Sequence, residues 1–304
     1  MPRRRSRGLL LCAVLQACGC SALAQKTPTP AAQLNGQELS RLPVPPNERY
    51  YLLLFGSQDA LHRPKYTHTW ATLVRAVCAP GAAAPALEVH TISWLPTSLD
   101  IRPLSREVEP GTNLGLNDTL NYVLGGKEKV VMWGPYQVSY PFTVRFLTQK
   151  AFLDSGAVGY QCDDVIGEAA RYGNGCDCIH AITDMDPVYP RGRYPLAAYG
   201  VPATANTVRR FMHSPVFIEP RTTHDWLLCR LGLDQYPIDR RTYHGRSEPW
   251  EPGAPGLHAV AAPPLPGIPL LPKGPTPKTA PGIETKGGKS APAPPGPGSQ
   301  PPAP

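Results

Sequence analysis

Hydrophobic positions gather in four stretches of the chain that are short, rich in β-branched or aromatic residues, and bordered by glycine or proline. Stretches of this kind are typical of β-strands. They predict strands at 49–55 (RYYLLLF), 66–77 (YTHTWATLVRAV), 87–95 (LEVHTISWL) and 129–138 (KVVMWGPYQV). The loop between the second and third strands is long enough for an antiparallel return.

Apolar residues at helical spacing, with capping residues before them and prolines at suitable positions, predict four helices. They are expected at 117–124, at 141–153, from Asp177-Cys178 to a point before Pro187, and at 224–233. Because strands and helices are grouped along the chain and do not alternate, the pattern favours an α+β domain with an antiparallel sheet and packed helices.

The two ends of the chain differ in composition from the part between them. Residues 1–24 hold four arginines, an apolar run and then Ala22-Leu23-Ala24, which is typical of a secretory signal cleaved after Ala24. Residues 246–304 are rich in proline and predict a disordered or polyproline-like tail. With a proline-containing linker at 25–47, residues 48–245 are left as a single domain.

The first 24 residues predict a protein that is secreted or held in the cell envelope. Their apolar run is shorter than the roughly 20 residues that a membrane span needs. The segment Leu15-Gln16-Ala17-Cys18 resembles a bacterial lipoprotein box, so lipid attachment at Cys18 is a second possibility and the expected route to a membrane. Without the four arginines of the signal, the net charge of +7 falls to +3, with no clustered basic face. The sequence therefore argues against nucleic acid as a partner.

The motif NGCDCIHAITD at 174–184 offers the most specific chemistry in the chain. If Asp177 caps a helix, Cys178 lies in its first turn, where backbone donors and the helix dipole favour an anion. Such a position lowers the pKa of a thiol and raises the proportion of thiolate, which is the nucleophilic form. Cys178 is therefore the candidate nucleophile. His180 is not chosen as its base, because residues two apart on a helix point to different sides.

His68 and His90 are the candidate partners of Cys178, because each lies within a predicted strand. Alternation places His68 on one face with Trp70, and His90 on one face with Ile92 and Trp94. If the two strands pair, both imidazoles can lie on the face against which the Cys178 helix packs. His68 would then act as the base and His90 would orient it, which is the logic of a catalytic triad.

The order of a histidine in one strand, a polar residue in the next, and a cysteine at a helix start resembles the circularly permuted NlpC/P60 papain-like group, which includes the lecithin:retinol acyltransferase-like proteins. The Asn-Cys-x-His-Phe box of that group is similar to the segment 177–181, with Asp177 in place of asparagine and Ala181 in place of the aromatic residue. The segments THTWAT, HTISWLP and CIHAITD also resemble segments of uncharacterised secreted bacterial proteins.

The resemblance implies a papain-like fold and a cysteine amidase, peptidase or acyltransferase, with Cys178, His68 and His90 as its catalytic residues. For an exported protein, the substrates that it implies are peptide or lipid bonds of the envelope. A different class remains open, namely a non-catalytic envelope protein that binds a partner and whose cysteines are structural.

The five cysteines after residue 24 allow two further interpretations of the motif. In an oxidising compartment, two disulfides among Cys78, Cys162, Cys176 and Cys229 would leave Cys178 free. A metal site would use Cys162, Cys176, Cys178 and His180, but their spacing is not that of common zinc sites. We therefore expect no metal. No cofactor is expected either, because the sequence contains neither a glycine-rich phosphate loop nor a serine elbow.

Overall fold

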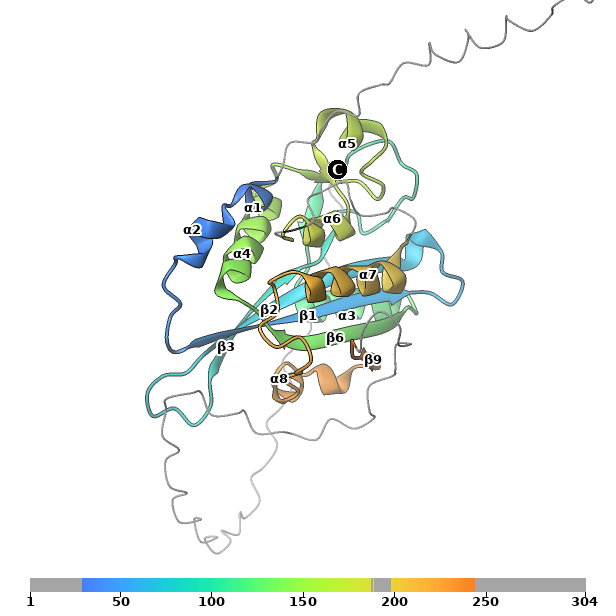
Figure 1. Cartoon of the computed structure of the whole chain (residues 1–304). Helices are drawn as coiled ribbons and strands as arrows, with labels where there is room; N and C mark the ends of the chain where they lie inside the picture. The colour runs from blue at the N-terminus through green and yellow to red at the C-terminus, as the bar shows by residue number, and fades with distance from the viewer. Residues whose placement is uncertain (1–28, 187, 189–197, 244–304) are drawn as a thin grey trace, which may run out of the picture. The chain divides into compact units, whose positions relative to one another are not determined.

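The computed structural model describes residues 29–186, 188 and 198–243, and its centre is a five-stranded sheet of order β3-β2-β1-β6-β9 (Figure 1). Its strands are β1 (Glu48–Gln58), β2 (Thr67–Val77), β3 (Ala86–Ile92), β6 (Lys129–Gln137) and β9 (Ile238–Arg241). All neighbouring strands pair antiparallel except β9, which runs parallel to β6. The α+β prediction is confirmed. The sheet is mixed, however, because β9 runs parallel to β6. The sequence pattern did not predict β9, which follows the helices α7 (Gly200–His213) and α8 (Trp226–Arg230) along the chain.

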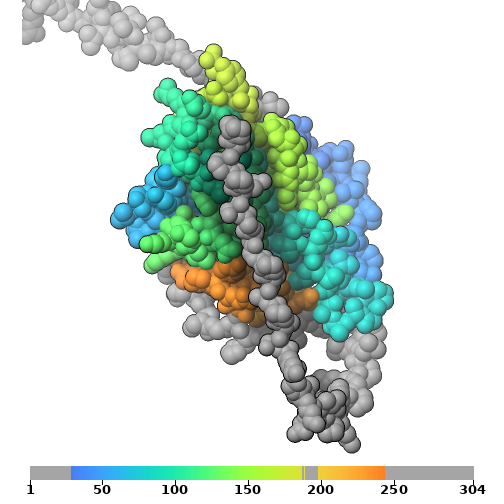
Figure 2. Space-filling model, turned by 180° about the vertical axis from the view of Figure 1, so that it is seen from behind, coloured from blue at the N-terminus to red at the C-terminus, as the bar shows by residue number. Residues whose placement is uncertain are grey.

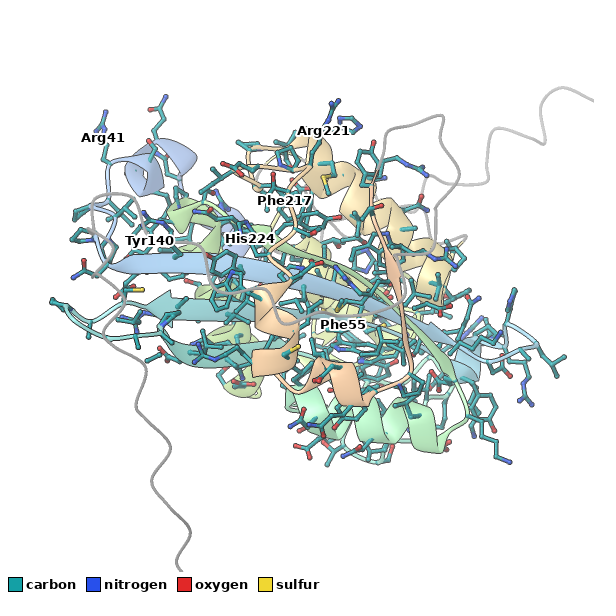
Figure 3. All side chains as sticks on the ribbon, turned by 90° about the horizontal axis from the view of Figure 1, so that it is seen from below. Arg41, Phe55, Tyr140, Phe217, Arg221 and His224 are labelled. Carbon is teal, nitrogen blue, oxygen red and sulfur yellow. The ribbon has the colours of Figure 1, made fainter. Side chains whose placement is uncertain are left out.

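Helices cover both faces of this sheet, as the edge-on view in Figure 3 shows. The helices that pack on its two faces are α3 (Leu116–Gly125), α4 (Tyr140–Asp154), α6 (Cys178–Thr183), α7 (Gly200–His213) and α8 (Trp226–Arg230). The side that carries α4, α6 and α7 is called the α7 face, and the side that carries α3 and α8 is called the α3 face. The smaller elements are α1 (Pro30–Gln33), α2 (Gly36–Ser40), α5 (Gly167–Tyr172), β4 (Trp94–Pro96), β5 (Gly111–Asn113), β7 (Gly159–Tyr160), β8 (Gly175–Cys176) and the 3-10 turns at Pro64–Tyr66 and Leu233–Gln235.

The continuous apolar runs of β1 and β2 are explained by burial on both faces. Alternate residues of β1 belong to two separate cores: Leu52 and Leu54 pack on the α7 face, while Leu53 and Phe55 pack on the α3 face. Successive side chains of a strand point to opposite faces, so a strand covered on both sides needs an apolar residue at every position. Phe55 is also stacked on Trp70 across the pairing of β1 with β2, with ring centroids 5.0 Å apart.

The predicted third strand, 87–95, is two strands in the structure. The backbone of Ser93 leaves β2 because its N–H donates to the side chain of Asn113 and its C=O accepts from Leu114. From Trp94 onward the chain pairs with β5 in a second, two-stranded sheet. The other three predicted strands and the helices α3, α4 and α6 lie close to their expected places, whereas α8 is shorter than expected.

The segment 25–47, which was expected to be a linker, contains two short helices that pack on α4. The guanidinium of Arg145, a buried residue of α4, donates to the backbone oxygens of Ala31 (2.6 Å) and Leu34 (2.5 Å). The described part of this segment is therefore docked on the domain. The expected signal at 1–24 and the expected tail at 246–304 lie outside the described residues. Among the described helices, none is long and apolar enough to cross a membrane.

Candidate functional site

The motif around Cys178 forms the helix start that its sequence predicts. The side chain of Asp177 accepts a hydrogen bond from the backbone N–H of His180 at 2.6 Å, and α6 begins at Cys178. Just before the helix, β8 pairs with β7, which brings Cys176 opposite Tyr160. The expectation that Asp177 caps this helix is therefore confirmed.

The thiol of Cys178 does not have the low pKa that its helix position predicts. Burial raises its pKa well above the ordinary value and the neighbouring Asp177 adds to the increase, while a backbone N–H of Thr69 opposes it. Burial is the larger cause, and the cap adds to it because the carboxylate of Asp177 takes up a backbone donor of the first turn and places a negative charge beside the sulfur. Cys178 is consequently a thiol, and not a thiolate, at neutral pH.

His68 lies on the α3 face of the sheet, on the side away from α6. It shares that face with Trp70, on which its ring is stacked at 5.4 Å between centroids. The next residue along β2, Thr69, points to the α7 face, where its hydroxyl lies 3.0 Å from that of Thr204. His68 Nε2 is hydrogen-bonded to Ser93 Oγ at 2.9 Å, and burial lowers the pKa of His68 to about 3. The ring is therefore neutral, and alternation turns it away from the face on which α6 packs.

His90 is far from His68. It lies directly opposite Leu73 in the pairing of β3 with β2, five residues along β2 from His68. At about 3.4 Å per residue, this places the two histidines roughly 17 Å apart along the sheet. His90 Nε2 instead contacts Glu88 Oε1 at 3.0 Å. The expectation that His90 orients His68 is therefore wrong, and the two rings lie on opposite faces because directly paired residues share a face.

His180 is the histidine of the motif that does have close acidic neighbours. Its Nδ1 lies 2.9 Å from Asp164 Oδ1 and 3.1 Å from Asp177 Oδ2, and all three side chains are buried. Burial alone would lower the pKa of His180, but the two carboxylates raise it well above its ordinary value. We call Asp164, Asp177 and His180 the Asp-His-Asp cluster. Asp164 was not predicted as a site residue. The two acidic residues Asp163 and Asp164 directly after Cys162 are the sequence signal that could have indicated it.

The cysteines around the Asp-His-Asp cluster are not joined to one another. None of the five cysteines in the described residues forms a disulfide. Burial raises the pKa of Cys162 to about 12, with Asp177 contributing in the same direction. The Sγ of Cys176 donates to the backbone oxygen of Asp177 at 3.3 Å. The structure thus groups His180 with two carboxylates, and not with Cys162, Cys176 and Cys178 as the metal site considered from the sequence would require. The disulfide framework stays a prediction.

A second group of polar residues lies beneath α3. Ser57 pairs directly with His68 across β1 and β2, and its hydroxyl donates to Glu128 Oε2 at 2.5 Å. Burial raises the pKa of Glu128 to about 7, and Ser57 opposes this increase. Ser57, His68 and Ser93 are fully or almost fully buried, so this group contributes to the interior of the domain and is not open to a substrate.

A groove of about 400 Å³ opens beside β3, at the start of α3. It is lined by Val89, Thr91, Asn113, Leu114, Gly115, Leu116, Asn117, Asp118, Lys150 and Leu231. These residues come from the edge strand of the sheet, from β5 and the beginning of α3, and from two other parts of the chain. Figure 2 shows this side of the domain, where the orange surface around α8 adjoins green and teal surface.

Comparisons of the chain with protein families, with curated proteins and with solved structures found no match.

Proposed function

We propose that this protein is an exported, non-catalytic binding protein that holds an extended peptide segment along the edge strand β3. The observation that carries the proposal is the groove beside Val89 and Thr91, at the end of the sheet. Extended peptides add to sheet edges through main-chain hydrogen bonds, and neighbouring pockets select their side chains.

The edge strand has the properties that strand addition needs. In the described residues β3 pairs only with β2, so every second N–H and C=O of β3 faces away from the sheet. Val89 is 42% exposed, so an apolar side chain of this edge strand is open to a partner. Glu88 and His90 give the other face of β3 a polar surface, which leaves the side with Val89 as the apolar one.

The groove beside β3 suits one apolar side chain of a bound strand. Val89, Leu116 and Leu231 provide apolar walls. Asn117, Asp118 and Lys150 add polar side chains to the lining. Because Val89 and Thr91 are two residues apart on a strand, they lie on the same face as the groove. A partner strand paired with β3 would direct alternate side chains into this space.

The cysteine hydrolase or acyltransferase implied by the sequence resemblance stays a prediction, but its geometry is less favourable. A nucleophilic thiol needs a base within hydrogen-bond reach. The ring of His68 is directed to the α3 face and bonded to Ser93, while His90 contacts Glu88. The raised pKa of Cys178 also disfavours a nucleophilic thiolate. A binding function requires neither a thiolate nor a nearby base, so it fits the described site better.

The proposal is tested with two synthetic heptapeptides that alternate threonine and valine and are capped at both ends. One has ordinary peptide bonds, and the other is N-methylated at every residue, so that neither of its edges can donate to an edge strand. Amide chemical shifts of the secreted full chain should change along β3 and around the groove with the first peptide only. Similar changes with the N-methylated peptide would contradict strand addition.

Matched variants locate the site and separate binding from catalysis. Val89→Lys places a charge in the groove and should weaken binding by about tenfold or more, whereas Ile218→Lys alters a similarly exposed apolar residue elsewhere and should leave it unchanged. Cys178→Ser should bind the peptide as the unaltered chain does. Cleavage of the peptide by the unaltered chain, absent in Cys178→Ser, would favour the hydrolase instead.

A further inference from the structure

The Asp-His-Asp cluster joins two segments that are distant in sequence. Asp164 lies in the loop after β7, while Asp177 and His180 belong to the cap and first turn of α6. Their exposed fractions are 0%, 3% and 2%, and one donor atom of each lies within 4.8 Å of those of the other two. This placement depends on the fold, since the pairing of β7 with β8 brings the loop beside the start of the helix.

Two of the three separations between the donors match those of adjacent ligands around one ion. His180 Nδ1 is 2.9 Å from Asp164 Oδ1 and 3.1 Å from Asp177 Oδ2. Adjacent ligands of an octahedral ion with bonds of about 2.1 Å are roughly 3.0 Å apart. A cation can therefore be accommodated between these atoms with small side-chain shifts once the proton on Nδ1 has left. Two carboxylates also balance the charge of one divalent ion.

A second observation concerns the other nitrogen of the same ring. His180 Nε2 is buried and has no hydrogen-bond partner within the described part of the chain. The ring therefore lies in the interior with Nδ1 against two carboxylates and Nε2 without a partner among the described residues, which is rare for a buried polar group. A metal ion on Nδ1 would place its positive charge between the two carboxylates.

We propose that Asp164, Asp177 and His180 bind a divalent transition-metal ion, with Nδ1 of His180 and one oxygen of each carboxylate as ligands. One nitrogen and two oxygens form a donor set of the kind used by Mn²⁺, Fe²⁺, Co²⁺, Ni²⁺ and Zn²⁺, and they are less suited to the soft Cu⁺. Because the cluster is closed by the surrounding side chains, the ion would hold the loop after β7 against the start of α6. The proposal is independent of the peptide site at β3.

The first experiment uses the secreted full chain without an affinity tag, treated with EDTA and then dialysed. Titration with Co²⁺, followed by visible absorption, should reveal one bound ion per chain. Zn²⁺ should compete for the same site and raise the melting temperature, because a ligand that binds only the folded state stabilises it. A melting temperature that is the same with EDTA and with Zn²⁺, together with no Co²⁺ spectrum, would overturn the proposal without any variant.

Variants then assign the ligands. Asp164→Asn and His180→Gln should each weaken Co²⁺ binding by about 100-fold or more. Asp163→Asn changes the neighbouring, partly buried carboxylate and should leave the affinity unchanged. Circular dichroism checks that each variant is folded. If Asp163→Asn weakens binding as much as Asp164→Asn, the ion is held by general negative charge and the assigned ligand set is wrong.

Discussion

Leu73 lies directly opposite His90 where β3 pairs with β2, and this register places His90 on the α7 face of the sheet while His68 lies on the α3 face. The sheet therefore separates two polar groups. His68 belongs with Ser57 and Ser93 beneath α3, and the Asp-His-Asp cluster belongs to the other side, where α6 packs on β2. Two members of the group beneath α3, Glu128 and His68, have pKa values shifted by burial, and the effect of each on stability can be measured separately.

Glu128 should make the domain less stable as the pH rises from about 4.5 to 7. Its carboxyl has a pKa of about 7 in the folded chain, raised by burial from an ordinary value of 4.5. Below pH 4.5 the group is protonated in both states. Between pH 4.5 and 7 only the unfolded chain loses the proton, so the free energy of unfolding decreases by on the order of 3 kcal/mol.

The Glu128→Gln variant retains a hydrogen-bond acceptor for Ser57 and has no titrating group. Urea unfolding at several pH values should show that the difference between variant and unaltered chain grows in favour of the variant up to pH 7 and is constant above it. Glu38→Gln, a change of an exposed carboxylate on α2, is the control. A constant difference from pH 4 to 8 would show that folding does not raise the pKa of Glu128.

His68 should have the opposite effect on the acid side. Its pKa is lowered by burial from 6.5 to about 3, so the folded domain keeps it neutral while the unfolded chain takes up a proton below pH 6.5. The contribution of the neutral His68 to the free energy of unfolding is complete above pH 6.5. It is lost as the pH falls toward 3, by about 1.4 kcal/mol for each pH unit. His68→Gln should flatten this part of the stability curve, whereas the exposed His62→Gln should not. Equal acid slopes for both variants would contradict the neutral, buried state of His68.

Much of the sheet follows from local pattern, because β1, β2 and β6 have apolar side chains for both faces and glycine or proline near their ends. The helix α7 was not predicted. Its sequence, GVPATANTVRRFMH, begins with glycine and is rich in threonine, so intrinsic propensity is low and packing on β1 and β2 stabilises it. Local pattern also predicted the cap at Asp177.

The arrangement of the candidate site depends on long-range register, which a single sequence does not contain. Alternation assigns His68 and His90 to faces within their own strands, but which faces coincide is set by the pairing of Leu73 with His90. Likewise, Asp164 meets His180 only because β7 pairs with β8. Single residues with suitable chemistry can therefore be predicted from the sequence more easily than the groups of residues that the fold brings into contact.

Gly56 should be essential for the contact between β1 and α7. A Cβ at this position would lie 3.0 Å from the Cα of Val201 and would overlap the hydroxyl of Thr204. Thr204 is fully buried and bonded to Thr69, so it has little freedom to move. Gly56→Ala should lower the free energy of unfolding by about 1 to 3 kcal/mol or more, measured by urea denaturation. Gly125→Ala, where a Cβ meets nothing within 4 Å, is the matched control, and an equal effect of both changes would show that the contact is loose.

Arg145 should hold the segment 29–40 on the domain. Its buried guanidinium donates to the backbone oxygens of Ala31 and Leu34. Burial lowers the pKa of Arg145, but a guanidinium stays charged in proteins. Arg145→Met removes both donors, and each buried oxygen left without a partner costs about 1 to 3 kcal/mol unless the segment detaches. Detachment is the easier outcome, because α1 and α2 have only four and five residues and pack mainly on α4.

Limited proteolysis with thermolysin, followed by mass spectrometry, measures this detachment. Cleavage near Leu34 and Leu39 should be faster in Arg145→Met, while fragments that retain the sheet resist cleavage as in the unaltered chain. Lys150→Gln changes a basic residue on the same helix whose partner is the partly exposed Asp154, and it should leave the cleavage rate unchanged. If Arg145→Met is cleaved no faster than Lys150→Gln, the apolar contacts of Ala31 and Leu39 are sufficient to hold the segment and the guanidinium is not its anchor.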